Sequence, residues 1–247
     1  MSRRLRRSLL AILGTGLVAA LAAATAPLLY PHFEPASWWY PVTGVDVSNH
    51  QGEIDWQALA SSGIGFAYIK ATEGETFRDK SFARNWSEAD RAGVPRGAYH
   101  FFTLCRSAAE QAKNFIDTVP KDPKALPPVV DAEHMGPCTW SATIEDHAAE
   151  LTDFIDMLER HYGRRPLVYT TAEYDGAMLS GVLEKERFWA RSLVVPPLFR
   201  RSQWVIWQYH NRGRRPGVSG DIDLNVFRGT REEFDGFASG ADLRRAD

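Results

Sequence analysis

Short apolar segments alternate with amphipathic segments from residue 43 almost to the end of the chain. Each short segment is bounded by glycine, proline or polar residues, which is typical of buried strands. Strands that alternate with helices form parallel β/α units. Eight strands are expected, with little chain left for helices between the last of them: 43–48, 65–70, 95–102, 126–133, 166–170, 188–190, 204–209 and 222–227. The pattern predicts an irregular, TIM-like α/β barrel in a single domain.

Four helices are predicted between the first five strands. The first begins near Asp55, a suitable N-cap residue, and the second covers residues 80–92. The third covers residues 107–119 and begins with the capping-box spacing of Ser107 and Glu110. The fourth covers residues 143–162 and is followed by a glycine. These helices would form the outer layer of the barrel.

The fourth strand segment, 126–133, ends in two carboxylates one residue apart. Side chains alternate across a strand, so Asp131 and Glu133 are expected on the same face. Two acids this close repel each other, which raises the pKa of at least one and keeps a proton bound near neutral pH. General-acid catalysis of glycoside cleavage needs such a group. The same residues would also suit a strand end whose acids cap a helix or pair with arginine, and both interpretations are open here.

Two further acids, Asp46 and Asp223, also fall at or near the ends of predicted strands. In α/β barrels the functional side chains gather at the C-terminal ends of the strands. The four acids are therefore expected to meet at one end of the barrel.

Residues 1–35 are predicted to form a signal peptide or membrane anchor with a short linker, and residues 36–247 a catalytic domain. Four arginines precede an apolar stretch, and small residues at 24–26 resemble a cleavage site. If cleavage does not occur, residues 8–30 are long enough to span the inner membrane. The protein is thus expected to be exported, either periplasmic or secreted. Its net charge of −2 gives no reason to expect a nucleic-acid partner.

The only two cysteines, Cys105 and Cys138, fit an exported protein. An even number of cysteines in an oxidising compartment favours a disulfide. Each cysteine follows a predicted strand end by a few residues, so a bridge would join two loops near the site. Two free thiols are the other interpretation.

Six segments of the chain resemble the glycoside hydrolase family 25 lysozymes, the Chalaropsis-type N-acetylmuramidases, and follow the order of that family. They are residues 44–52, 69–74, 96–102, 130–133, 207–209 and 223–227, so the resemblance runs from about residue 42 to 227. It implies a barrel of five β/α units and three further strands, (β/α)5β3. It also implies retaining hydrolysis of the β-1,4 bond between N-acetylmuramic acid and N-acetylglucosamine in peptidoglycan strands. We expect a monomer with no cofactor and no metal.

The resemblance also implies roles for the four acids. Glu133 matches the general acid/base of the family. Asp131 matches its partner, which is either the nucleophile or the group that orients the acetamide of the substrate. Asp46 and Asp223 match two further acids that line the site.

Five residues at or just past strand ends are predicted to contact the substrate: Tyr99, Tyr169, Trp207, Tyr209 and Glu73. Flat aromatic rings at these places would stack on sugar faces. Aromatic residues on strands also commonly belong to the core, and Glu73 would equally be satisfied by an ion pair with Lys70 or a nearby arginine.

Two other functions fit an α/β barrel. A metal-dependent peptidoglycan deacetylase needs a compact ligand set, such as two histidines at helical spacing with an acid, and the histidines of this sequence show no such pairing. A non-catalytic glycan-binding protein would keep the aromatic residues and usually lose the acids.

Overall fold

The computed structural model describes residues 15, 24–25, 30–104, 106–133 and 143–241. The chain divides into two compact units, Met1–Phe33 and Glu34–Asp247. In the first unit, the 3-10 helix η1 (Tyr30–His32) is described. None of the described helices is long and apolar enough to cross a membrane. Most of the predicted leader or anchor at 8–30 lies outside the described residues, and so do both cysteines of the predicted disulfide. These two expectations stay predictions.

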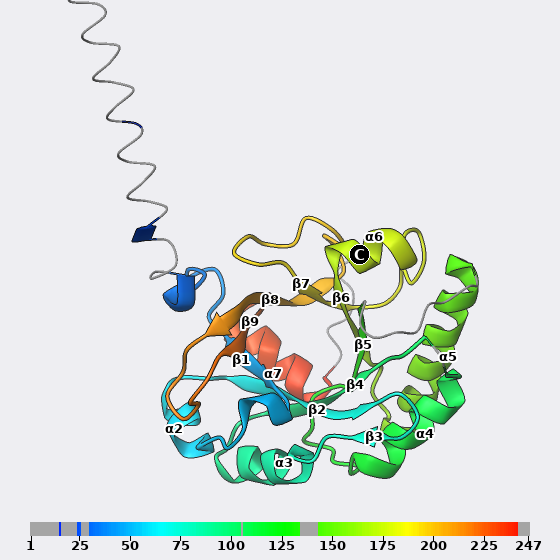
Figure 1. The fold of residues 1–247 in the computed structure, drawn as a ribbon, viewed down its shortest axis with the longest axis horizontal. Coiled ribbons are helices and arrows are strands. Elements are labelled where there is room, and N and C mark those ends of the chain that lie inside the picture. The colour runs from blue at the N-terminus through cyan, green and yellow to red at the C-terminus, as the bar shows by residue number, and fades with distance from the viewer. Residues whose placement is uncertain (1–14, 16–23, 26–29, 105, 134–142, 242–247) are drawn as a thin grey trace, which may run out of the picture. The chain divides into compact units, whose positions relative to one another are not determined.

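Eight strands of the second unit close into a barrel, which confirms the predicted fold class (Figure 1). Going round the barrel, the order is β1-β9-β8-β7-β6-β5-β4-β2, and β1 pairs with β2 to close the ring. A short ninth strand, β3 (Phe77–Arg78), extends the sheet beside β2. The barrel strands are β1 (Thr43–Val47), β2 (Phe66–Glu73), β4 (Arg96–Phe101), β5 (Val129–Ala132), β6 (Leu167–Thr171), β7 (Phe188–Arg191), β8 (Trp204–Gly213) and β9 (Ile222–Phe227).

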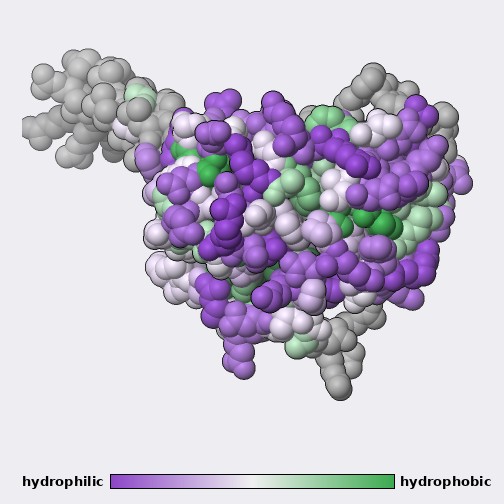
Figure 2. Space-filling model, turned by 90° about the horizontal axis from the view of Figure 1, so that it is seen from below, coloured by the Kyte–Doolittle hydropathy of each residue, from purple (hydrophilic) through white to green (hydrophobic). Residues whose placement is uncertain are grey.

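Each of the first five barrel strands is followed by an α-helix, which gives the expected (β/α)5β3 arrangement. The helices are α2 (Trp56–Ser61), α3 (Phe82–Arg91), α4 (Ala108–Thr118), α5 (Ile144–Tyr162) and α6 (Ala172–Met178). The predicted caps are confirmed: the Asp55 side chain accepts two backbone N–H groups, and Ser107 forms a capping box with Glu110. The 3-10 helix η2 (Asn49–Gln51) follows β1 directly. Seen from the side on which α3 lies, the surface is mostly hydrophilic, as expected for the outer face of such helices (Figure 2).

The barrel is not fully parallel, because β9 runs in the opposite direction to its neighbours. β9 runs antiparallel to both β8 and β1, whereas the other neighbouring barrel strands are parallel. The start of β9 therefore lies at the same end of the barrel as the C-terminal ends of the parallel strands. This places Asp223, near the start of β9, directly opposite Asp46 of β1.

The opposite end of the barrel is closed by α7 (Arg231–Ser239), which the apolar pattern does not predict. Phe234 packs 5.5 Å from the ring of Phe66 at the start of β2, and Phe237 packs 5.4 Å from the ring of Phe227 at the end of β9. All four rings are buried. A signal for this helix does exist in the sequence, since Thr230 and Glu233 form a capping box. With this end filled by aromatic side chains, the open end carries the polar residues of the barrel interior.

Candidate active site

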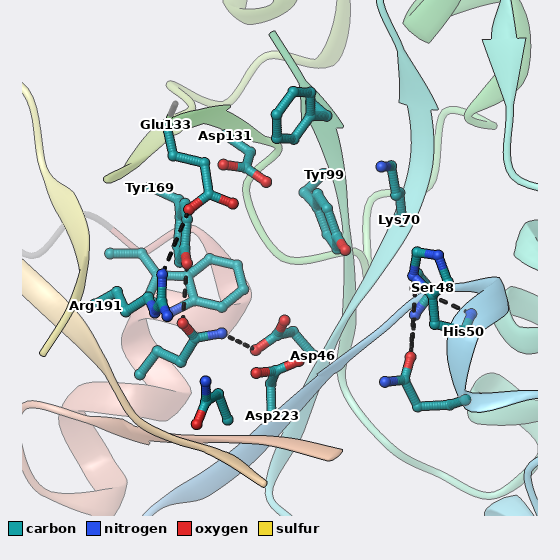
Figure 3. A pocket seen from close by; sticks show the side chains of 15 residues that line it. Asp46, Ser48, His50, Lys70, Tyr99, Asp131, Glu133, Tyr169, Arg191 and Asp223 are labelled. Atoms are coloured by element: carbon teal, nitrogen blue, oxygen red, sulfur yellow. Dashed lines mark hydrogen bonds and ion pairs between the residues drawn. The ribbon is translucent and has the colours of Figure 1, made fainter. Parts of the chain in front are cut away.

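A pocket of about 410 Å³ opens at the C-terminal ends of the parallel strands (Figure 3). Its walls contain all four predicted acids, and they come from three parts of the barrel. Asp46 lies on β1 and Asp223 on β9. Asp131 is the penultimate residue of β5, and Glu133 directly follows that strand. Three other lining residues carry basic side chains: Lys70, His50 and Arg191. The structure thus brings together the acids that the sequence placed at separate strand ends.

Asp46 is held by a chain of hydrogen bonds inside the barrel. Its Oδ2 accepts from Nε2 of Gln208 at 2.9 Å and from Nδ2 of Asn225 at 2.7 Å. These amides are fixed in turn, because the Tyr169 hydroxyl donates to Gln208 and the Trp189 indole N–H donates to Asn225. Burial raises the pKa of Asp46 to about 6, and the two amide hydrogen bonds and Arg191 limit that rise. Asp46 is therefore a rigid group that changes its charge close to neutral pH.

Asp223 lies beside Asp46 (Figure 3), and no comparable hydrogen bonds reach it from the residues that the structure describes. Burial, reinforced by the negative charge of Asp46, raises the pKa of Asp223 to about 9, while the positive charge of Arg191 limits the rise. At neutral pH Asp223 consequently carries a proton, because two neighbouring negative charges repel each other in a desolvated site. The pair can hold one proton between the first and last strands of the barrel.

The Asp46–Asp223 pair should lower the stability of the protein at high pH. Because the pKa of Asp223 is higher in the folded state than in the unfolded state, the free energy of unfolding is largest below about pH 4. It then decreases as the pH rises towards 9, where the buried carboxyl must lose its proton. Asp223→Asn removes the need for a proton, so we expect it to stabilise the protein at pH 8 by on the order of 2 kcal/mol, or roughly 5 °C in melting temperature. At pH 4 the difference should nearly vanish. Melting curves at both pH values measure this, and an equal shift at pH 4 and pH 8 would contradict the assignment.

Asp131 and Glu133 both point into the pocket, as expected from their spacing on one strand (Figure 3). Asp131 is the deeper of the two, and its Oδ1 is buried without a hydrogen-bond partner among the described residues. Burial, followed by the charge of Glu133, raises the pKa of Asp131 well above its ordinary value. Burial also raises the pKa of Glu133, while Arg191 and Lys70 lower it. Both carboxyls therefore bind a proton more tightly than an exposed acid does, and Glu133 is the more accessible one.

Arg191, at the end of β7, is a site residue that the sequence did not single out. Its Nη1 lies 3.8 Å from Oε2 of Glu133. Lys70, the other strong cation of the pocket, donates to Glu73 at 2.7 Å. An arginine that directly follows the predicted strand 188–190 is the signal that would have marked it.

The structure brings some of the predicted substrate contacts to the pocket and not others. Tyr99 and Tyr169 line it, and so does Phe101. Trp207 and Tyr209 do not line it, because both rings are fully buried among their neighbours. The residue between them, Gln208, takes the inward position of β8 and binds Asp46 instead. Glu73 is half-exposed and does not line the pocket, although it pairs with Lys70, which does.

Within the residues that the structure describes, no group of three His, Cys, Asp or Glu side chains is arranged to hold a metal ion. Four of the titratable groups that converge on the pocket are carboxyls with raised pKa values. Groups of this kind donate and accept protons near neutral pH. The arrangement therefore suits acid/base chemistry on a bound polar substrate.

Comparison with known proteins gives a consistent family. The model of the glycosyl hydrolases family 25 matches residues 45–218. Lysozyme M1 of Streptomyces globisporus is 36% identical over 203 residues, which cover 76% of this chain and 68% of that protein. The uncharacterized protein YegX of Escherichia coli K12 is 36% identical over 212 residues, covering 83% of this chain and 76% of YegX.

Solved structures agree with this result. A family 25 glycosyl hydrolase from Bacillus anthracis superposes with a TM-score of 0.75 at 40% identity, over 81% of this chain and 94% of that one. A lysozyme from Streptomyces coelicolor superposes with a TM-score of 0.76 at 34% identity, over 81% of this chain and 98% of that one. The chain belongs to family 25 of the glycosyl hydrolases and is a glycoside hydrolase.

Proposed function

We propose that this enzyme is a lysozyme that cleaves the β-1,4 bond between N-acetylmuramic acid and N-acetylglucosamine in peptidoglycan, with retention of configuration. The observation that carries the proposal is the convergence of Asp46, Asp131, Glu133 and Asp223 on one pocket. The relatives named as lysozymes, from Streptomyces globisporus and Streptomyces coelicolor, support the choice of substrate.

In the proposed mechanism, Glu133 is the general acid/base. Burial raises its pKa and so favours the protonated carboxyl that the leaving group needs. Glu133 then donates this proton to the oxygen of the leaving sugar, and the resulting carboxylate later accepts a proton from the attacking water. Its position at the open side of the acid pair suits contact with the glycosidic oxygen.

Asp131 has two alternative roles, nucleophile or orienter of the acetamide, and we favour the second. Its buried Oδ1 lacks a hydrogen-bond donor among the described residues, and the N–H of a 2-acetamido group would supply one. A hydrogen bond to the ionised form lowers the pKa of Asp131. Substrate binding would thereby leave the proton of the pair on Glu133, where the leaving group needs it. The acetamide oxygen would attack the anomeric carbon.

Asp46 and Asp223 would complete the site as a second acid pair, and Tyr99 and Tyr169 would contact the sugar. The amides of Gln208 and Asn225 donate hydrogen bonds to Asp46, and the Tyr169 hydroxyl donates to Gln208. Such fixed polar groups stabilise developing charge without having to reorganise during the reaction.

The test of the function is the identity of the new chain ends. Purified peptidoglycan is incubated with the enzyme, the new reducing ends are reduced with borohydride, and the sugars are identified after hydrolysis. Reduced muramic acid should accumulate with time. Reduced glucosamine would assign the other glycosidic bond, and the absence of new reducing ends would refute the proposal.

We further propose that the protein is exported, that residues 1–35 serve as signal peptide or anchor with a linker, and that residues 36–247 form the catalytic domain. The basic and apolar pattern of the N-terminus supports export. Sequencing the N-terminus of the exported protein tests this. A start near residue 26 would indicate cleavage, an intact leader in the membrane fraction would indicate anchoring, and accumulation in the cytoplasm would contradict both.

A further inference from the structure

A second hollow of about 470 Å³ adjoins the active-site pocket. It is lined by the end of β6, the start of α6 and the residues that follow β7, including Thr171, Glu173, Ser192 and Leu193. Glu133 and Arg191 line both hollows. A substrate whose reacting bond lies at Glu133 can therefore place a neighbouring group in the second hollow.

Arg191 separates the two hollows and has donors to spare. Its guanidinium group carries five N–H donors in a planar fork. In the described part of the chain its partner is Glu133 at 3.8 Å, a distance longer than the 2.7–2.9 Å of a charge-assisted hydrogen bond. The Arg191 side chain is one-third exposed. Lys70 differs, because Glu73 already holds its ammonium group.

The rest of the second hollow has a mixed lining, polar at Thr171 and Ser192 and apolar at Ala172 and Leu193. Leu193 is partly exposed at its rim, followed by the exposed side chains of Val194 and Val195. Glu173 is exposed in the first turn of α6 and would repel an anion there. An acidic substituent would consequently bind at the Arg191 side of the hollow.

We propose that the second hollow binds the carboxylate-bearing lactyl substituent of N-acetylmuramic acid, with Arg191 as the receptor of the carboxylate. This inference rests on the proposed lysozyme function and names the part of the substrate that the enzyme reads. The carboxylate is either that of the free lactyl group or, when a peptide stem is attached, the nearest carboxylate of the stem. The lactyl group distinguishes muramic acid from glucosamine, so Arg191 would make the enzyme specific for peptidoglycan over a polymer of N-acetylglucosamine.

The experiment compares one oligosaccharide of alternating N-acetylglucosamine and N-acetylmuramic acid in three forms: with a free lactyl group, with a peptide stem, and with the lactyl carboxyl reduced to an alcohol. kcat/KM is measured for the wild type, Arg191→Gln and the control Arg91→Gln. Arg91 is an exposed arginine of α3 that lines neither hollow. Binding of the same three compounds to Glu133→Gln, with and without Arg191→Gln, is measured by calorimetry.

The wild type should prefer one or both carboxylate forms over the reduced form by about 10- to 100-fold, the range expected for hydrogen bonds between charged partners. Arg191→Gln should abolish that preference through a higher KM and weaker binding, and Arg91→Gln should retain it. Of the two carboxylate forms, the one whose kcat/KM and affinity fall more in Arg191→Gln identifies the source of the carboxylate, either the free lactyl group or the peptide stem.

Equal loss by Arg191→Gln on all three compounds would overturn the inference, since Arg191 would then act through Glu133. A wild type without preference for the carboxylate would overturn it as well. Neither result would affect the lysozyme assignment, which fails only if the wild type releases no muramic-acid ends from peptidoglycan.

Discussion

Glu133→Gln is expected to lower kcat on peptidoglycan by about 1,000-fold or more, with little change in melting temperature. Removing a general acid/base typically costs a factor of about 10² to 10⁴. Gln has nearly the same shape as Glu, but its amide cannot deliver a proton to the leaving oxygen. The release of soluble muropeptides over time, measured with matched enzyme concentrations, gives the rate.

Glu232→Gln is the matched control for this experiment. Glu232 is exposed in the first turn of α7, at the opposite end of the barrel, and the same substitution there should leave kcat unchanged. Activity of Glu133→Gln within tenfold of the wild type would show that another residue supplies the proton.

Asp131→Asn is expected to give the second largest loss, about 100- to 1,000-fold in kcat. If Asp131 orients the acetamide, the variant loses the carboxylate that accepts the acetamide N–H and balances the charge of the cyclic intermediate. If Asp131 is the nucleophile, the variant cannot form the covalent intermediate. Rates alone therefore do not separate the two roles.

A stable thiazoline analogue of the cyclic intermediate separates them. Under the mechanism that we favour, the analogue should inhibit the wild type strongly and Asp131→Asn at least tenfold less. A glycosyl adduct on Asp131, trapped with a slow fluorinated substrate and located by mass spectrometry of peptides, would establish the nucleophile role instead.

Several features of the barrel were predictable because they depend on neighbouring residues. Asp131 and Glu133 share one face because strand side chains alternate, and the caps at Asp55 and Ser107 follow from the need of helix N-termini for acceptors. Neighbouring residues did not show which side of β8 faces the pocket, so Trp207 and Tyr209 were expected to line it although they do not. Their spacing correctly placed them on one face of β8, but it could not show that Gln208 takes the inward face.

The sequence by itself determined the fold class, the family and the acids that meet at the barrel mouth, since strand and helix periods, caps and ordered motifs are local signals. Only the tertiary structure decided the direction of β9, which brings Asp223 opposite Asp46, and the place of Arg191 between two hollows. It also decided which amides hold Asp46, because Gln208 and Asn225 reach it from strands more than 160 positions away. The physical reason is that strand pairing and charge environments arise between residues distant in the chain, and alternation along one strand carries no information about the strand beside it.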